Sequence, residues 1–248
     1  MLLQDRVALV TGSGTGIGEA IARRLAEEGA RAYLFDLNAE SNRRVAESIA
    51  AAGGWAEAIT GDVCRAADLA ALVEAARARF GRIDILVNNA GIYPRRPFLE
   101  ITDEQWDEMQ DINLKSMFRA SQLALKPMMA ARAGKIVNIS SVTFFLGVAN
   151  LAHYTASKGG VIGLTRSLAR AAGPHNVHVN CVTPGFIQTE SEVRLVNQEE
   201  ARKMVADQCL DRRITPLDVA RVCLFLACEL SDGMTGQCLN VDGGWVMH

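Results

Sequence analysis

Short apolar runs recur along the chain at intervals that suit a sheet, and helical patterns fill most of the gaps between them. Between two of these runs, Leu69, Leu72, Val73, Ala76 and Phe80 recur at three- and four-residue steps, which places them on one face of a helix. The pattern predicts alternating strands and helices. The expected strands are Val7–Thr11, Ala32–Asp36, Ala56–Thr60, Ile83–Asn88, Lys135–Ser140, Val177–Val182 and Gln237–Val241.

Strands that are apolar along their whole length are buried on both faces, which requires helices on both sides of a mostly parallel sheet. The sequence therefore predicts an α/β fold with a doubly wound, seven-stranded parallel sheet. The chain of 248 residues has no linker, internal repeat or low-complexity tract, so we expect a single domain over residues 1–248. Only Gly185 to Arg213 lacks clear periodicity.

Charge and hydropathy narrow the class of function. The formal net charge is −2, and no run of five like charges suggests a nucleic-acid or membrane surface. No export signal precedes the first strand, and no stretch of about 18 apolar residues could cross a bilayer. We expect a cytoplasmic protein that acts on a small molecule and binds neither nucleic acid nor membrane.

Cysteine and histidine usage gives no sign of a metal site or a disulfide framework. Six cysteines are scattered without a C-x-x-C pair, which is typical of reduced, buried thiols. His175 and His178 have a spacing that could suit a metal, but no Cys or carboxylate accompanies them. We expect a surface loop and an outward strand position there, and no metal.

A glycine-rich turn follows the first strand, reading Thr11-Gly-Ser-Gly-Thr-Gly-Ile-Gly18, and Glu19–Glu28 then reads as a helix. Glycines let the backbone approach a pyrophosphate at the positive end of that helix. Asp36 ends the next strand, where a dinucleotide fold needs an acceptor for the adenosine ribose hydroxyls. Its charge repels a 2′-phosphate, so we predict NAD rather than NADP. Arg43 and Arg44 read as a solvated helix face.

Candidate chemistry lies in the second half of the chain. Tyr154 and Lys158 stand four residues apart in the helical stretch Leu151 to Ala172, so both side chains share one face. A phenol with an unperturbed pKa of about 10 is a poor base, but adjacent positive charge favours the phenolate. Ser141 follows the strand Lys135–Ser140, whose carboxyl end borders the ligand crevice, so it can face Tyr154.

These separated motifs together resemble the classical short-chain dehydrogenases/reductases across essentially the whole chain. The glycine turn is similar to the family's cofactor turn, Asn88-Asn-Ala-Gly91 to its motif after the fourth strand, and Tyr154-Thr-Ala-Ser-Lys158 to its catalytic helix. The resemblance implies a Rossmann fold, a hydride transfer between a nicotinamide and an alcohol or carbonyl carbon, and a homotetramer.

The resemblance also implies residue roles. Tyr154 would be the general acid/base, Ser141 would bind the substrate oxygen, Asn113 would hold a water, and Lys158 would bind the nicotinamide ribose and depress the pKa of Tyr154. The implied cofactor contacts are Gly12, Thr15, Gly16, Ile17, Gly18, Asp36, Leu37, Asp62, Val63, Asn89, Ala90, Gly91, Tyr154, Lys158, Pro184, Gly185, Ile187 and Thr189.

The substrate side reads as apolar, with a few polar side chains, and residues 187–210 are expected to form a lid over it. The expected substrate contacts are Ser141, Tyr93, Thr143, Phe145, Leu151, His153 and Tyr154. Within the family, Gly91-Ile-Tyr-Pro94 and the C-terminal segment are similar to 1-phenylethanol dehydrogenase, and Thr143-Phe-Phe145 to pyridoxal 4-dehydrogenase. The likeness implies a secondary, aromatic or cyclic alcohol as substrate.

Two alternatives stay open. The first is an NADPH-dependent 3-oxoacyl-(acyl carrier protein) reductase, which the carboxylate of Asp36 disfavours. The second, of another class, is a non-catalytic NAD-binding protein on the same fold. Such a protein would be expected to have lost a member of the set Asn113, Ser141, Tyr154 and Lys158, and this sequence has all four.

Overall fold

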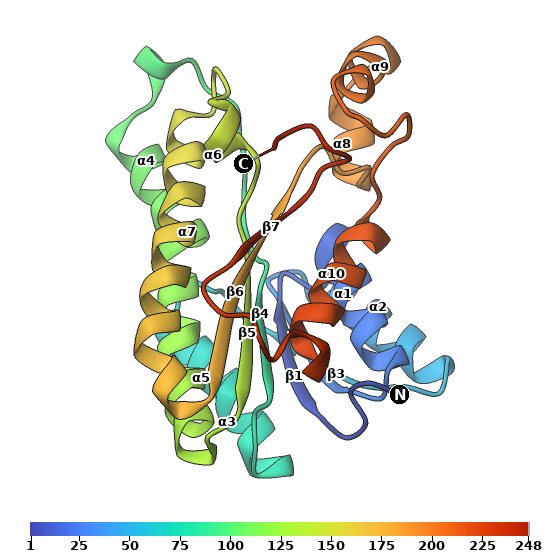
Figure 1. Cartoon of the computed structure of the whole chain (residues 1–248), viewed down its shortest axis with the longest axis vertical. Helices are drawn as coiled ribbons and strands as arrows, with labels where there is room; N and C mark the ends of the chain where they lie inside the picture. Colours follow the sequence, from blue (N-terminus) through green and yellow to red (C-terminus); the bar gives the residue numbers. More distant parts are fainter. Residues whose placement is uncertain (248) are drawn as a thin grey trace.

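One parallel sheet organises the molecule, with its strands in the order β3-β2-β1-β4-β5-β6-β7 (Figure 1). The computed structural model describes residues 1–247, except the side chains of Ser191, Arg194 and Leu195. All seven predicted strands are confirmed, with small differences at their ends. They are β1 Val7–Thr11, β2 Arg31–Asp36, β3 Trp55–Thr60, β4 Ile85–Asn88, β5 Gly134–Ile139, β6 Val177–Pro184 and β7 Cys238–Val241.

Helices cover both faces of this sheet, so the predicted doubly wound, single-domain architecture is confirmed. Figure 1 shows α1, α2 and α10 on one side and α3, α5 and α7 on the other. The helices are α1 Gly16–Glu27, α2 Ala39–Ala51, α3 Ala66–Phe80, α4 Asp103–Gln110, α5 Ser116–Ala131, α6 Thr143–Leu146, α7 Ala152–Ala172, α8 Glu190–Leu195, α9 Gln198–Ala206 and α10 Pro216–Ala227.

Strand β2 shows why the apolar runs form central strands. Ala32 and Leu34 pack on the side of α1, whereas Tyr33 and Phe35 pack on the side of α3, and all four side chains are fully buried. Burying one large apolar side chain stabilises the fold by about 1.5–3 kcal/mol. The predicted apolar face of α3 is confirmed, because Leu69, Leu72, Val73 and Ala76 are buried and Phe80 packs beside them.

The segment without periodicity contains two helices, α8 and α9, that lie beyond the carboxyl ends of the strands (Figure 1). Each is too short to show a helical repeat, and each begins at a side-chain cap. Thr189 accepts a hydrogen bond from the backbone N–H of Glu192, and Asn197 accepts one from that of Glu200. The patterns T-x-x-E and N-x-x-E indicate a helix start locally. The spacing of apolar residues in this segment does not indicate a helix.

The thiols and the candidate metal ligands are placed as follows. All six cysteines are free thiols, but the expectation that they are buried is wrong for Cys209, which is exposed in the segment after α9. Within residues 1–247 no group of three or more His, Cys, Asp or Glu side chains is placed to hold a metal ion. In the same residues no helix is both long and apolar enough to cross a membrane.

A buried chain of polar side chains joins the sheet to the helices on one face. The amide of Asn88 donates to Ser121 Oγ on α5 (3.0 Å) and to Asn138 Oδ1 on β5 (2.8 Å), and the amide of Asn138 donates to Thr165 Oγ1 on α7 (2.9 Å). All four side chains are at most 1% exposed. A satisfied buried network of this kind fixes how helices pack against strands.

We predict that Asn138→Ala lowers the free energy of unfolding by roughly 2–4 kcal/mol, because it leaves one N–H of the Asn88 amide buried without a partner, removes the hydrogen bond to the Thr165 hydroxyl and opens a small cavity. Urea denaturation of parent and variant measures the difference. The matched control is Gln198→Ala, which removes an exposed amide at the start of α9. Equal stability of Asn138→Ala and the control would contradict this role.

Candidate active site

The glycine turn between β1 and α1 has backbone geometry that side chains would block. Gly12 and Gly16 have φ angles of +64° and +59°, in the left-handed region that favours glycine. A Cβ on Gly18 would lie 1.9 Å from the carbonyl oxygen of Gly12, and one on Gly12 would lie 2.8 Å from the Cα of Ala90. The backbone beside the start of α1 is therefore open to a phosphate, so the turn fits a dinucleotide.

Asn89, after β4, holds this turn in place. Its amide donates to the carbonyl oxygens of Thr11 (3.1 Å) and Gly12 (2.9 Å), while the Thr11 hydroxyl accepts from the backbone N–H groups of Asn89 and Ala90. Asn89 and Thr11 thus hold the glycine turn in its observed shape.

Asp36 lies at the carboxyl end of β2, directly beside the glycine turn. Its carboxylate accepts hydrogen bonds from the backbone N–H groups of Gly14 (2.8 Å) and Asn38 (2.9 Å). Leu37 is 73% exposed next to it. Arg43 and Arg44 pair with the helix carboxylates of Glu47 and Glu19, which agrees with the interpretation of a solvated helix face.

The remaining expected cofactor residues reach the same edge of the sheet. Asp62 accepts a hydrogen bond from Cys64 N (2.8 Å) after β3, and Val63 packs against the core. After β6, a Cβ on Gly185 would lie 2.5 Å from that of Asp242, so only glycine fits there. Thr189 approaches the glycine turn: its methyl group lies 3.4 Å from where a Cβ of Gly16 would be.

Three of the expected catalytic side chains meet between β5 and α7. The phenol of Tyr154 hydrogen-bonds the hydroxyl of Ser141, which also accepts from Thr143 N (3.2 Å). The ammonium of Lys158 lies 5.6 Å from the centroid of the Tyr154 ring and donates to the carbonyl oxygen of Ile139 (2.9 Å). Lys158 is only 3% exposed. A phenol, a hydroxyl and an ammonium thus share one site at the carboxyl edge of the sheet.

Asn113 lies in a π-helical turn, Asp111–Lys115, that joins α4 to α5. Turns of this kind occur frequently at functional sites. The Asn113 side chain accepts from Ile92 N (2.8 Å), donates to Ile92 O (2.9 Å) and reaches Ser157 Oγ (3.3 Å). It therefore ties the loop after β4 to the turn and to α7, and a Cβ on Gly91 would lie between Asn113 and Lys158.

Burial dominates the ionisation of the two central groups. It raises the pKa of Tyr154 to about 12, against the opposing effect of the hydrogen bond from Ser141, with a further rise from Tyr93. It lowers the pKa of Lys158 to about 8. Both shifts favour the uncharged forms, so this site opposes isolated charges.

The expected substrate residues divide into two groups. Tyr93 is 42% exposed and its ring lies 6.3 Å from that of Tyr154. The Thr143 hydroxyl oxygen is buried without a hydrogen-bond partner among the described residues. Phe145, Leu151 and His153 instead pack inside the protein. Phe145 lies against the core cluster of Met117, Val161, Ile162 and Cys181, while Leu151 and His153 are 5% and 1% exposed.

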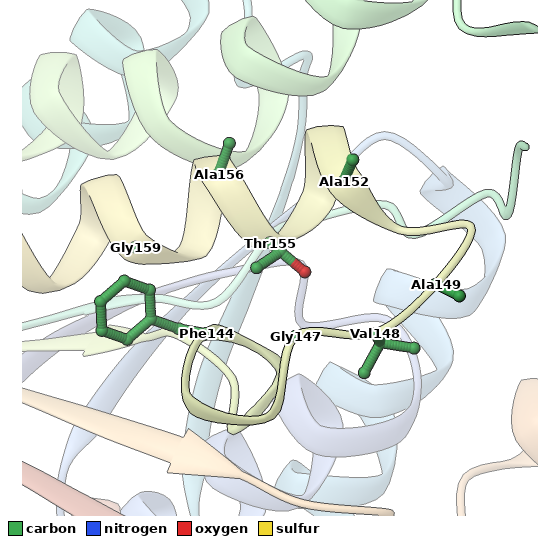
Figure 2. Close-up of a pocket in the computed structure, with 8 residues that line it drawn as sticks. All are labelled: Phe144, Gly147, Val148, Ala149, Ala152, Thr155, Ala156 and Gly159. Carbon is green, nitrogen blue, oxygen red and sulfur yellow. The ribbon is translucent and has the colours of Figure 1, made fainter. Parts of the chain in front are cut away.

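A shallow hollow of about 650 Å³ lies between α6 and α7 (Figure 2). It is lined by Phe144, Gly147, Val148, Ala149, Ala152, Thr155, Ala156 and Gly159, and the figure shows the Phe144 ring lying beside Gly159. These α7 positions lie on a different face of the helix from Tyr154 and Lys158. The hollow is therefore separate from the catalytic side chains.

The sequence interpretation missed three side chains in the expected lid and just after it. Glu192 on α8 is buried and pairs with Arg213, whose guanidinium lies 4.4 Å from the centroid of the Phe186 ring. Glu192 is the last residue of the pattern T-x-x-E, which indicates a helix start. No sequence pattern predicts its ion pair with Arg213.

Comparisons with known proteins agree with this geometry. The family model described as Enoyl-(Acyl carrier protein) reductase matches residues 12–246. A protein of Rhizobium meliloti named a probable galactose dehydrogenase is 39% identical over 98% of this chain and 95% of its own. The 3-oxoacyl-[acyl-carrier-protein] reductase of Vibrio cholerae is 38% identical over 100% of both chains.

A solved structure gives the same result. A crystal structure of a protein from Agrobacterium tumefaciens, proposed to be a gluconate dehydrogenase, superposes with a TM-score of 0.94 at 35% identity, covering 99% of this chain and 98% of that one. These similar proteins are named for sugar, sugar-acid and oxoacyl substrates. The likeness to 1-phenylethanol and pyridoxal dehydrogenases is therefore not specific.

The buried ammonium predicts a pH-dependent stability. Unfolding returns Lys158 to its ordinary pKa of 10.5, so between about pH 8 and 10.5 the unfolded chain binds more protons than the folded one. The contribution of Lys158 to the free energy of unfolding should therefore rise across this window, by on the order of 2–3 kcal/mol.

Urea denaturation at pH 7, 8, 9 and 10 of the parent and Lys158→Met measures this contribution as the difference between the two curves. The difference should grow with pH in favour of the parent. The exposed lysine variant Lys126→Met is the control and should follow the parent. A constant difference across the window would show that Lys158 keeps an ordinary pKa.

Proposed function

This chain belongs to the classical short-chain dehydrogenase/reductase family and is an oxidoreductase acting on CH–OH groups, and we propose that it uses NAD(H) to interconvert a secondary, aromatic or cyclic alcohol and its carbonyl compound. One observation carries the proposal. The phenol of Tyr154 hydrogen-bonds Ser141, with the Lys158 ammonium beside its ring, at the same sheet edge as the glycine turn and Asp36.

In this proposal Tyr154 takes the proton of the substrate hydroxyl during oxidation and returns it during reduction. The hydroxyl of Ser141 holds the substrate oxygen beside the phenol. When bound, NAD would supply the hydride acceptor and a positive charge next to the phenol. Lys158 would hold the nicotinamide ribose, and Asn113 would hold the water that continues the proton path from Lys158.

The charges around Tyr154 explain why a cation is needed. With its pKa at about 12, the Tyr154 phenol stays protonated near neutrality. A positive charge beside a phenol favours the phenolate, and the Lys158 ammonium lies 5.6 Å from the centroid of the Tyr154 ring. The oxidised nicotinamide would add a second positive charge that acts in the same direction.

Asp36 supports NAD over NADP. The carboxylate stands next to the glycine turn, and a 2′-phosphate about 4 Å away would cost about 4 kcal/mol at the same dielectric. The NADPH-dependent 3-oxoacyl reductase, the activity named for the Vibrio cholerae relative, is disfavoured on this ground. A non-catalytic role is disfavoured because the chemical groups of Tyr154, Ser141 and Lys158 are all assembled.

We also propose the cofactor contacts, the lid over residues 187–210, the homotetramer and the cytoplasmic location, which follow from the family resemblance. Among the expected substrate contacts, Tyr93 and Thr143 would offer polar atoms to the substrate, whereas Phe145, Leu151 and His153 would act by shaping the wall of its site. The sugar-related names of two similar proteins favour a cyclic or polyhydroxylated alcohol over an aromatic one.

We predict that Tyr154→Phe lowers kcat at least a thousandfold and leaves NADH affinity within about threefold, because it removes the transferable proton and keeps the ring. Alcohol-dependent NAD reduction and NADH fluorescence titration measure the two quantities. Tyr33→Phe is the matched control: it removes a phenol oxygen that donates to Ala75 O on α3, away from the site, and should change kcat less than tenfold. Activity of Tyr154→Phe within tenfold of the parent would exclude this role.

We predict that Asp36→Ala combined with Leu37→Arg moves cofactor preference from NAD toward NADP. The carboxylate's repulsion ends, its hydrogen bonds to the ribose hydroxyls are lost, and a guanidinium can pair with the 2′-phosphate, a contact worth about 1.5–3 kcal/mol. The ratio of kcat/KM for the two cofactors should shift at least a hundredfold.

Leu37→Gln, which adds a polar group without charge, is the control for this double variant and should keep the parental preference. A parent that already prefers NADP, or a ratio that the double variant leaves unmoved, would show that Asp36 does not face the adenosine ribose.

A further inference from the structure

Polar groups without partners gather in the segment that covers the cleft. Glu192 is 8% exposed, and its Oε2 takes a hydrogen bond from Arg213 while its Oε1 is buried with no hydrogen-bond partner among the described residues. The Nε of Arg213 is buried and unpartnered within the same residues. The guanidinium is held from the other side by the ring of Phe186.

Gln208 repeats this pattern a short distance along the chain. Both its amide oxygen and its amide nitrogen are buried without a partner in the described part of the chain. Its Oε1 occupies the space beside Gly243, where it would lie 2.6 Å from a Cβ. Gly243 follows Asp242, which touches Gly185 at the cofactor edge. Gln208 therefore packs against the C-terminal segment that contacts Gly185.

Glu192 is connected to the catalytic tyrosine through two side chains. Its backbone N–H donates to the hydroxyl of Thr189 (3.2 Å), and that hydroxyl hydrogen-bonds the phenol of Tyr93. Burial, and then the negative charge of Glu192, raises the pKa of Tyr93, so the carboxylate lies near that phenol. The Tyr93 ring in turn lies 6.3 Å from the ring of Tyr154.

Buried polar atoms in folded proteins almost always have a partner, because leaving one unpaired costs the free energy of removing it from water. Here a carboxylate oxygen and a guanidinium N–H of one ion pair are both buried without a partner among the described residues. Arg213 donates to Glu192 Oε2, which leaves Oε1 free to accept a hydrogen bond. A ligand with a second hydroxyl group matches this acceptor.

Resting on the proposed function, we propose that the substrate is a polyol of the sugar or sugar-acid kind, and that Glu192 Oε1 accepts a hydrogen bond from a hydroxyl other than the one oxidised. Arg213 and Phe186 position the carboxylate. An alcohol with a single hydroxyl leaves Glu192 Oε1 unpaired in the closed cleft. Sites built to hydrogen-bond a substrate hydroxyl discriminate strongly against analogues that lack it.

The test uses four alcohols with NAD: D-galactose and D-gluconate as neutral and acidic polyols, and cyclohexanol and 1-phenylethanol as alcohols with one hydroxyl. The measured quantity is the ratio of kcat/KM for the better polyol to kcat/KM for cyclohexanol. In the parent this ratio should exceed one. Glu192→Ala should lower it about ten- to a hundredfold, and Glu192→Gln, which keeps an acceptor oxygen without the charge, should lower it less.

Glu199→Gln is the matched control, because it makes the same change in charge on the exposed side of α9. It should keep the parental ratio. A purely structural role of Glu192 in the lid would lower kcat/KM for both classes of alcohol together and leave the ratio unmoved, which would overturn the proposal. A neutral or an acidic polyol that shows the predicted fall supports it and identifies which of the two is bound.

The same experiment separates this proposal from the proposed function. Oxidation of cyclohexanol or 1-phenylethanol in preference to both polyols, lost in Tyr154→Phe, would overturn the polyol assignment and leave the alcohol dehydrogenase intact. Absence of turnover with all four alcohols in a parent that binds NADH by fluorescence titration would overturn both.

Discussion

The shared direction of the strands determines where every functional group of this chain can lie. In the strand order of the sheet, β1 lies between β2 and β4, and β5, β6 and β7 follow outward from β4. Because all pairs are parallel, the segments after Thr11, Asp36, Asn88 and Pro184 leave the same edge. The strand order therefore brings four features together that are far apart in sequence. They are the glycine turn, Asp36, Asn89 and the start of the segment 187–210.

The buried surroundings of Tyr154 and Lys158 oppose the charged forms that the proposed chemistry uses. Burial keeps the Tyr154 phenol protonated and weakens the charge of Lys158, so the protein alone disfavours the ionised pair. Such perturbed groups in a cleft are a common property of catalytic sites. Lys158 donates to the carbonyl oxygen of Ile139, and Asn138, the preceding residue on β5, belongs to the satisfied buried network with Asn88.

The fold and the nucleotide side were predictable because their signals are local. Uninterrupted apolar runs indicate buried strands, and a Cβ excluded at Gly18 or Gly12 leaves glycine in the sequence. The substrate side was less predictable. The sequence pattern is the same whether an aromatic residue such as Phe145 lines a substrate site or packs against Val161. Only the structure shows that Phe145 is partly buried against this core cluster. The pairing of Glu192 with Arg213 brings together residues 21 positions apart, which no periodicity encodes.

This contrast follows from what each half of the site must recognise. The turn at Gly12 and Gly18 excludes side chains by contact with backbone atoms, so its shape tolerates no substitution without movement of β1 or α1. The segment 187–210 depends on side-chain caps at Thr189 and Asn197 and on one ion pair, which other residues can replace at modest cost. The glycine turn therefore restricts the sequence more tightly than the segment that would contact the substrate. Substrate identity must therefore be sought in the pairing of polar atoms within residues 187–213, because the shape of the sheet is common to many substrates.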